Sequence, residues 1–131
     1  MRGTVRWLAV GTVVVLGGAG YVSLWPGPGS GRPVWTVPGG DPEQGARAML
    51  RHGCQACHVI DGLREATGRV GPKLEDIEHQ IYLGGVLPNS PRNMSLWIQD
   101  PPEFSPATAM PDLGVSEADA RHIAAYLLAR E

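Results

Sequence analysis

The residues best suited to chemistry are two cysteines and a histidine in the stretch "GCQACH", residues 53–58. Cys54 and Cys57 are the only cysteines among 131 residues, and His58 follows them directly. A Cys-x-x-Cys pair can act as a redox dithiol or as half of a zinc site, and with an adjacent histidine it can attach a c-type haem. The motif thus limits the chemistry to three kinds of site.

The rest of the chain favours the third kind. A structural zinc site needs four ligands from separated pairs, whereas the remaining histidines, His52, His79 and His122, each occur alone. A dithiol oxidoreductase needs a βαβ frame, and no strand pattern supplies one here. We therefore interpret the motif as a haem attachment site, in which two thioethers bind the porphyrin and His58 ligates the iron.

The N-terminal part has a different composition from the rest. Residues 7–25, "WLAVGTVVVLGGAGYVSLW", carry no charge, and a helix of that length would extend about 29 Å. Arg2 and Arg6 precede it, which predicts a single-pass anchor in a bacterial cytoplasmic membrane with the remainder on the periplasmic side. A cleaved signal peptide is the alternative, because the small residues Gly18-Ala19-Gly20 resemble a processing site.

These patterns divide the chain into three parts. We assign residues 1–25 to the membrane anchor or signal peptide, and residues 26–40, rich in proline and glycine, to a mobile linker. Residues 41–131 form the domain, which contains helix signals and no strand signals. The sequence therefore predicts an all-α domain behind a single N-terminal transmembrane helix.

Three helices of this domain have clear starts. Asp41 is an N-cap followed by Pro42, and this helix is expected to end near His52; Ser90 and Ser116 are the caps of two later helices. A weaker apolar pattern predicts a short helix at 73–83, formed around Leu74, Ile77 and Ile81 and ended by Gly84-Gly85. The connections at 59–72 and 99–115 are long, which is typical of loops that wrap a cofactor.

Five segments of this domain, taken in order, resemble a known protein family. The ordered set "GCQACH", "GPKL", "NMSLWIQDP", "PATAMPDL" and "SEADARHIAAYLLA" resembles the class I c-type cytochromes over nearly all of residues 41–131. The resemblance implies a cytochrome c-like fold around one covalent haem c, attached through Cys54 and Cys57, with His58 and Met110 as axial ligands. It also implies that the Pro72 carbonyl accepts the His58 Nδ1 proton. Trp97 would then lie beside the haem, and Tyr126 would join the packing of the first and last helices.

The same resemblance implies a one-electron carrier and not an enzyme, since two axial ligands leave no open position on the iron. The expected partners are membrane respiratory or photosynthetic complexes, with electrons passing from a quinol-oxidising complex toward a haem–copper oxidase. A second hypothesis is a fixed haem subunit of an oxidase, a reductase or a quinol-oxidising complex. Two further hypotheses are a haem-based sensor or peroxidase-like protein, from whose iron Met110 would depart, and a thiol-redox protein.

The net charge of the chain limits which partners it can bind. The chain has a formal net charge of −2, and residues 41–131 hold 8 basic and 13 acidic residues, with Lys73 as the only lysine. No nucleic-acid partner is expected, and docking onto an acidic partner through lysines is in doubt. Membrane lipid would contact residues 7–25, and tethering would replace electrostatic steering by raising the local concentration of the partner.

Several more residues have simpler interpretations. Met94 lies on an apolar helix face and is expected in the core, while His52 is too close to the motif to reach across the porphyrin. His79 is expected to be solvated or near a haem propionate, and His122 to lie on the surface. The acidic run Glu75, Asp76 and Glu78 predicts a solvated helix face.

Overall fold

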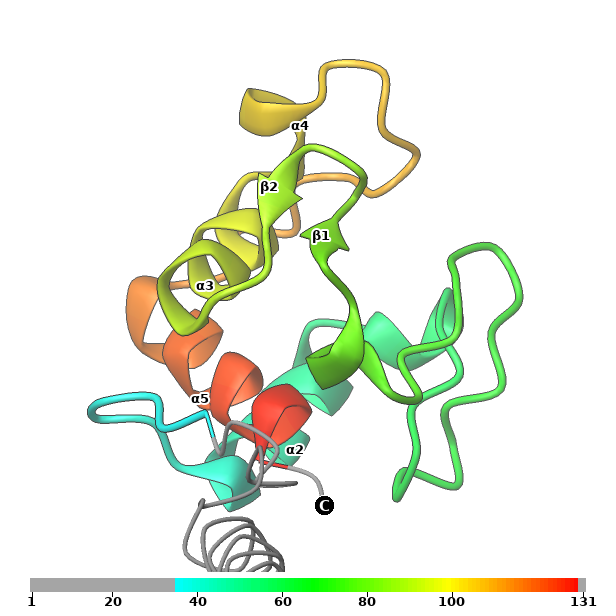
Figure 1. Cartoon of the computed structure of the whole chain (residues 1–131). Helices are drawn as coiled ribbons and strands as arrows, with labels where there is room; N and C mark the ends of the chain where they lie inside the picture. The colour runs from blue at the N-terminus through cyan, green and yellow to red at the C-terminus, as the bar shows by residue number, and fades with distance from the viewer. Residues whose placement is uncertain (1–34, 130–131) are drawn as a thin grey trace, which may run out of the picture. The chain divides into compact units, whose positions relative to one another are not determined.

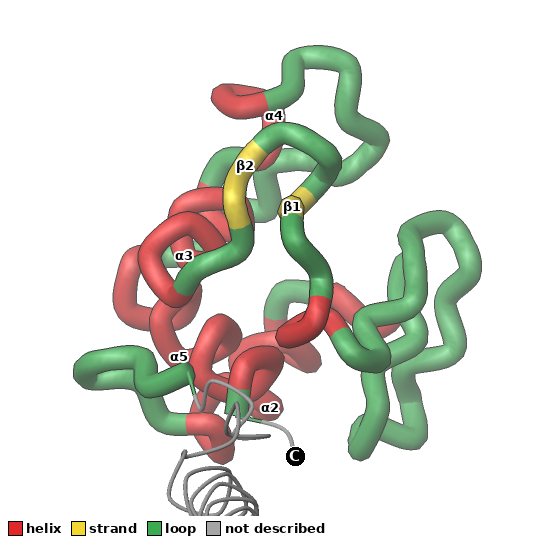
Figure 2. The backbone as a smooth tube through the Cα atoms, viewed as in Figure 1, coloured by secondary structure: helices red, strands yellow, loops and turns green. Residues whose placement is uncertain are grey.

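The computed structural model describes residues 35–129, in which the regular elements are mostly helices and long loops join them (Figures 1 and 2). The elements in chain order are α2 (Pro42–Arg51), η1 (Cys54–Ala56), η2 (Ile77–His79), β1 (Tyr82–Leu83), β2 (Leu87–Pro88), α3 (Pro91–Gln99), α4 (Pro101–Phe104) and α5 (Glu117–Leu128). The two short strands pair antiparallel in a hairpin, with Leu83 opposite Leu87.

The three predicted helix caps are present. The Asp41 carboxylate accepts hydrogen bonds from the backbone N–H groups of Glu43 and Gln44 at 2.9 and 3.1 Å. Ser90 and Ser116 cap α3 and α5 by accepting from the N–H three residues ahead, at 3.2 and 3.1 Å. Each cap satisfies a donor that the first helical turn leaves free, so local sequence fixes where these helices begin.

The core lies where α5 packs against α2 and α3. Met94 is 2 % exposed in this core, which confirms its predicted packing role. The remaining large buried side chains are Met49, Ile60, Leu83, Ile98, Ile123, Leu127 and Leu128. Much of the rest of the core is alanine, so the described residues enclose a small apolar interior.

The predicted helix at 73–83 is wrong. The only helical segment there is η2, and Tyr82–Leu83 form the strand β1. Asp76, just before η2, has a left-handed φ of 57°, and Ile81 is 77 % exposed. Gly84 and Gly85 do not end a helix; both have positive φ and form the turn between β1 and β2. The backbone at 77–80 is held instead by Asn89, whose side-chain amide donates to the carbonyls of Ile77 and Gln80 at 2.8 and 2.9 Å.

Part of the predicted linker lies against the helical core. Trp35 and Val37 are partly buried and pack on the core, and the N–H of Gly40 donates to the Val37 carbonyl at 2.9 Å. Residues 35–40 therefore belong structurally with the helices, whereas their composition predicted a mobile segment. The three-part division of the whole chain stays a prediction.

The predicted membrane helix, residues 7–25, falls outside the residues that the structure describes. Among residues 35–129, no helix has the length and apolar character needed to cross a bilayer.

Candidate functional site

The two cysteines and His58 lie in a single turn directly after α2. The N–H groups of Cys57 and His58 both donate to the Cys54 carbonyl, at 3.2 and 3.0 Å. Both cysteine side chains are half-buried, and neither is in a disulfide. The structure thus brings three of the four predicted site residues together on η1 and its following residues.

The imidazole of His58 is oriented by a loop further along the chain. His58 Nδ1 lies 2.7 Å from the carbonyl oxygen of Pro72. A carbonyl can only accept, so Nδ1 carries the proton, and in a neutral imidazole Nε2 then presents its lone pair. This hydrogen bond, which the resemblance predicted, is present, and it prepares Nε2 to bind a metal.

Backbone hydrogen bonds hold this loop against the motif. The N–H groups of Gly68 and Gly71 donate to the carbonyls of Gln55 and Cys57 at 3.2 and 2.8 Å. A Cβ atom at Gly71 would collide with the imidazole of His58, so only glycine permits this approach. Gly71 is a site residue that sequence reasoning did not single out, although the Gly-Pro step in "GPKL" was a signal for it.

Met110 lies on a separate loop between α4 and α5, and it is half-buried. Its N–H donates to Thr108 Oγ1 at 3.2 Å, and the Thr108 N–H donates to the Ser105 carbonyl at 2.9 Å. In Figure 1 this orange loop and the motif turn lie on opposite sides of the β1–β2 hairpin. Short-range hydrogen bonds thus shape the Met110 loop, and its ligation of iron stays a prediction.

Two more histidines, His52 and His122, serve helix packing. His52 Nε2 lies 3.1 Å from Asp119 Oδ2, and His122 Nδ1 accepts the N–H of Asp41 at 3.0 Å. His122 was expected on the surface, but it is half-buried because it joins α5 to the start of α2. Both side chains are therefore engaged between helices.

Trp97 and Tyr126 connect elements around the motif. Trp97 is half-buried against the core, and its ring lies beside Gly84 in the hairpin turn. The Tyr126 hydroxyl donates to the Asp61 carbonyl at 2.8 Å, which joins α5 to the loop after the motif. The predicted position of Trp97 beside a haem stays a prediction.

The environment of Cys54 indicates whether the two cysteines are suited to act as thiolates in a redox or zinc site. Burial raises the pKa of the Cys54 thiol above its ordinary value, which disfavours the thiolate. Redox dithiols and zinc ligands act as thiolates and lie where the cysteine pKa is lowered. Within residues 35–129, neither cysteine belongs to a cluster of three or more side chains able to ligate a metal. The raised pKa of Cys54 therefore does not favour a dithiol catalyst, and the described residues offer the cysteines no further metal ligands.

The same residues fit a covalent haem. Two thiols and an oriented imidazole form the donor set of c-type attachment. Within residues 35–129, five of the six large apolar side chains that are exposed lie in the loops and hairpin between the motif and α5, namely Val70, Ile81, Tyr82, Val86 and Leu113. A porphyrin is an apolar ring of the kind that such side chains contact.

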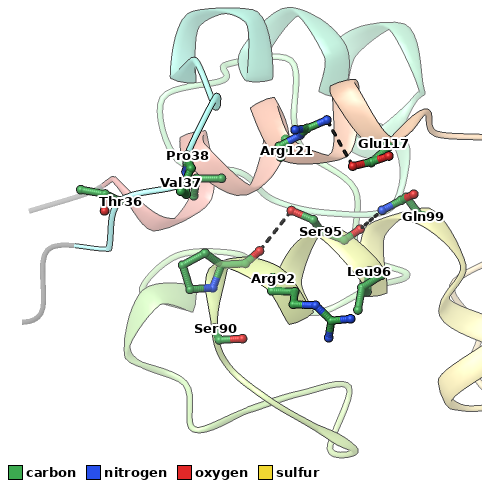
Figure 3. A pocket seen from close by; sticks show the side chains of 11 residues that line it. Thr36, Val37, Pro38, Ser90, Arg92, Ser95, Leu96, Gln99, Glu117 and Arg121 are labelled. Atoms are coloured by element: carbon green, nitrogen blue, oxygen red, sulfur yellow. Dashed lines mark hydrogen bonds and ion pairs between the residues drawn. The ribbon is translucent and has the colours of Figure 1, made fainter.

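A groove of about 660 Å³ lies elsewhere, between residues 36–38, α3 and the start of α5 (Figure 3). Its polar side chains bond mainly within their own helices: Arg121 pairs with Glu117 at 3.3 Å, and Ser95 Oγ donates to the Pro91 carbonyl at 3.1 Å. None of the predicted site residues lines it. We therefore place the candidate chemistry at the motif turn and not in this groove.

Comparison with known proteins decides the family. A family model described as cytochrome c matches residues 42–131. The chain belongs to the cytochrome c family. It is a class I c-type cytochrome, and its cofactor is a covalently bound haem c. Members of this family typically transfer electrons through haem and are not enzymes.

Two further proteins are similar to this cytochrome. Cytochrome c oxidase subunit 2 of Alkalihalophilus pseudofirmus is 29 % identical over 85 residues, which make up 64 % of this chain and 24 % of that protein. This cytochrome thus corresponds to about a quarter of that relative. The solved structure of cytochrome c2 from Rhodobacter sphaeroides is 24 % identical, with a TM-score of 0.48, over 67 % of this chain and 94 % of that one.

Proposed function

We propose that this cytochrome is a one-electron carrier that holds a single haem c through Cys54 and Cys57, with His58 and Met110 as axial ligands. The observation that carries this proposal is the 2.7 Å hydrogen bond from His58 Nδ1 to the Pro72 carbonyl, which leaves Nε2 free to ligate. When bound, the haem supplies an iron centre that accepts and returns one electron, and a methionine ligand raises its reduction potential.

The protein's own residues keep this site rigid. Pro72 and Gly71 hold the imidazole of His58 in one orientation, and the backbone bonds to Gln55 and Cys57 hold their loop in place. Thr108 shapes the loop that carries Met110. A fixed coordination sphere favours electron transfer, because little has to move when the charge changes.

The proposed setting is a bacterial cytoplasmic membrane, with residues 7–25 as the anchor and the haem domain on the periplasmic side. There the cytochrome passes electrons from a quinol-oxidising complex toward a haem–copper oxidase. The uncharged stretch at 7–25 and the similarity to an oxidase subunit support this setting. A tether raises the local concentration of membrane partners, which suits a domain with one lysine.

A fixed haem subunit of an oxidase is the second candidate. It is favoured by the match to part of a protein named cytochrome c oxidase subunit 2. Gentle purification from membranes separates the two functions. Oxidase subunits in a fixed ratio with this cytochrome indicate a subunit, whereas their absence indicates a carrier.

The carrier proposal is tested by rapid mixing. The reduced full-length protein, placed in vesicles that contain a bacterial haem–copper oxidase, should be reoxidised by oxygen far faster than in vesicles without the oxidase. A variant without residues 1–25, at the same concentration, should react more slowly because it has lost the tether. Equal rates with and without the oxidase would contradict the proposal. Carbon monoxide binding to the reduced wild type would favour a sensor or peroxidase-like protein.

A further inference from the structure

Three side chains around η2, none of them among the proposed haem ligands, lie close together. Asp76, Glu78 and His79 each offer one oxygen or nitrogen atom that could bind a metal, and these atoms all lie within 4.8 Å of one another. They form the only such group found within residues 35–129. The sequence predicted a solvated acidic face here, but the structure places the carboxylates beside an imidazole.

Glu78 has an environment that acidic side chains rarely occupy. Its side chain is only 9 % exposed, and its Oε2 atom is buried without a hydrogen-bond donor. The second oxygen, Oε1, lies 3.5 Å from His79 Nε2. Charge-assisted N–H···O bonds are shorter, about 2.7–2.9 Å, so His79 alone satisfies this carboxylate poorly. A buried charge normally has a close partner or binds a metal ion.

No further cation of the described chain is placed to complete this group. Lys73, the only lysine, pairs with Glu75 at 3.7 Å. The carboxylate of Asp76 lies near that of Glu78 and adds like charge to the cluster. A divalent cation between the two carboxylates would compensate the buried charge of Glu78 and remove this repulsion.

We propose that Asp76, Glu78 and His79 form a binding site for a divalent zinc-type cation. One imidazole nitrogen and two carboxylate oxygens suit zinc, whereas calcium and magnesium bind through oxygen ligands alone. Bonds of about 2.1 Å in a tetrahedral site separate two ligand atoms by about 3.4 Å. The 3.5 Å between Glu78 Oε1 and His79 Nε2 already matches this separation. Asp76 is exposed and can turn toward the ion, and water fills the fourth position.

The proposed zinc site includes none of the residues proposed to hold the haem. It lies in the segment that Asn89 holds through the carbonyls of Ile77 and Gln80. Zinc would link side chains of this segment to each other and so raise the temperature at which the loaded protein unfolds.

Calorimetric titration of the haem-loaded full-length protein with Zn²⁺ tests the proposal. We expect one saturable site per chain, weakened at least tenfold in H79Q and in E78Q, because changes to groups that merely support a ligand already weaken metal sites about 10–100-fold. Zinc should raise the melting temperature of the wild type and not that of H79Q.

Two matched variants serve as controls. E75Q removes the same charge from the neighbouring Lys73 pair, and H52Q removes the histidine that faces Asp119. Both should bind zinc like the wild type. The proposal is overturned if no saturable binding occurs, if E75Q weakens binding as much as E78Q, or if H52Q rather than H79Q abolishes it. The His79 side chain is 42 % exposed and that of Glu78 only 9 %, so H79Q is expected to fold even if E78Q does not.

Discussion

His58 is oriented by two residues of a loop 13 and 14 positions further along the chain. The Pro72 carbonyl fixes which nitrogen carries the proton, and Gly71 allows the backbone to lie against the imidazole. The motif "CQACH" indicates which residues bind the haem, but the direction of the imidazole depends on this second segment. At the residue scale, the site therefore consists of the motif together with the turn that faces it.

Gly71→Ala tests this second segment. The added methyl group would collide with the His58 ring and push the loop away, which should lower the free energy of unfolding by about 1–3 kcal/mol. Denaturant unfolding of the haem-loaded protein measures the change. Pro72→Ala is the control, because it keeps the carbonyl that accepts from His58. An unchanged free energy of unfolding in Gly71→Ala would show that the backbone at residue 71 does not press against the His58 imidazole.

Met110→Ala tests the sixth ligand. The variant should keep its covalent haem, bind carbon monoxide when reduced and have a lower reduction potential, because the iron loses a soft neutral ligand. Absorption spectra and a potentiometric titration measure these changes. Met94→Leu is the matched control: Met94 is buried in the core, and a swap of similar volume usually costs less than about 1.5 kcal/mol. If Met94→Leu opens the iron and Met110→Ala does not, the ligand assignment is wrong.

At the scale of elements, α2 and α5 are joined by a polar cluster as well as by the core. Asp119 of α5 accepts from Arg51 at 2.9 Å and lies 3.1 Å from His52 Nε2. The hydrogen bond from His52, with the charge of Arg51, holds the pKa of Asp119 below its ordinary value of 3.8. Because the folded-state pKa is lowered, this carboxylate stabilises the fold above pH 3.8, and its contribution is lost as the pH falls through the folded pKa.

Asp119→Asn should therefore change the acid side of the stability profile. At pH 6–7 we expect it to lower the free energy of unfolding by on the order of 1 kcal/mol, since a bond to a charged group is lost. The difference from the wild type should shrink as the pH falls below 3.8. Urea unfolding across this range measures it. Glu117→Gln removes an exposed carboxylate of the same helix that pairs with Arg121 of α5, and it should have little effect at neutral pH. A constant difference at all pH values would contradict the assignment.

The elements also show what the sequence can predict. Helices with a capping residue and a following proline or acid, at Asp41, Ser90 and Ser116, were located because caps act within one turn. The segment 73–83 was misassigned because its apolar spacing fits a helix, whereas part of its backbone is held by Asn89, which lies 12 residues beyond Ile77 and 9 beyond Gln80 and so outside any one helical turn. The packing of Trp35 and Val37 was missed for a similar reason. The proline and glycine content of residues 26–40 predicted a mobile linker, but composition does not show that two of its side chains pack on the helices.

At the scale of the molecule, the protein core is small and rich in alanine, and long loops surround the motif turn. A domain of this kind gains stability from a bound group that fills its interior. Replacement of both Cys54 and Cys57 by serine should remove covalent haem and leave a chain with little helix in far-ultraviolet circular dichroism. Near-native helix with a cooperative melt in this variant would show that the protein core is sufficient alone.

The central claim is that the whole chain carries one electron on one covalent haem. A potentiometric titration of the purified full-length protein, followed by haem absorption, tests it most directly. We predict a single reversible one-electron transition, with the haem still attached to the polypeptide after denaturation. No haem absorption, a multi-step transition, or haem released on denaturation would contradict it.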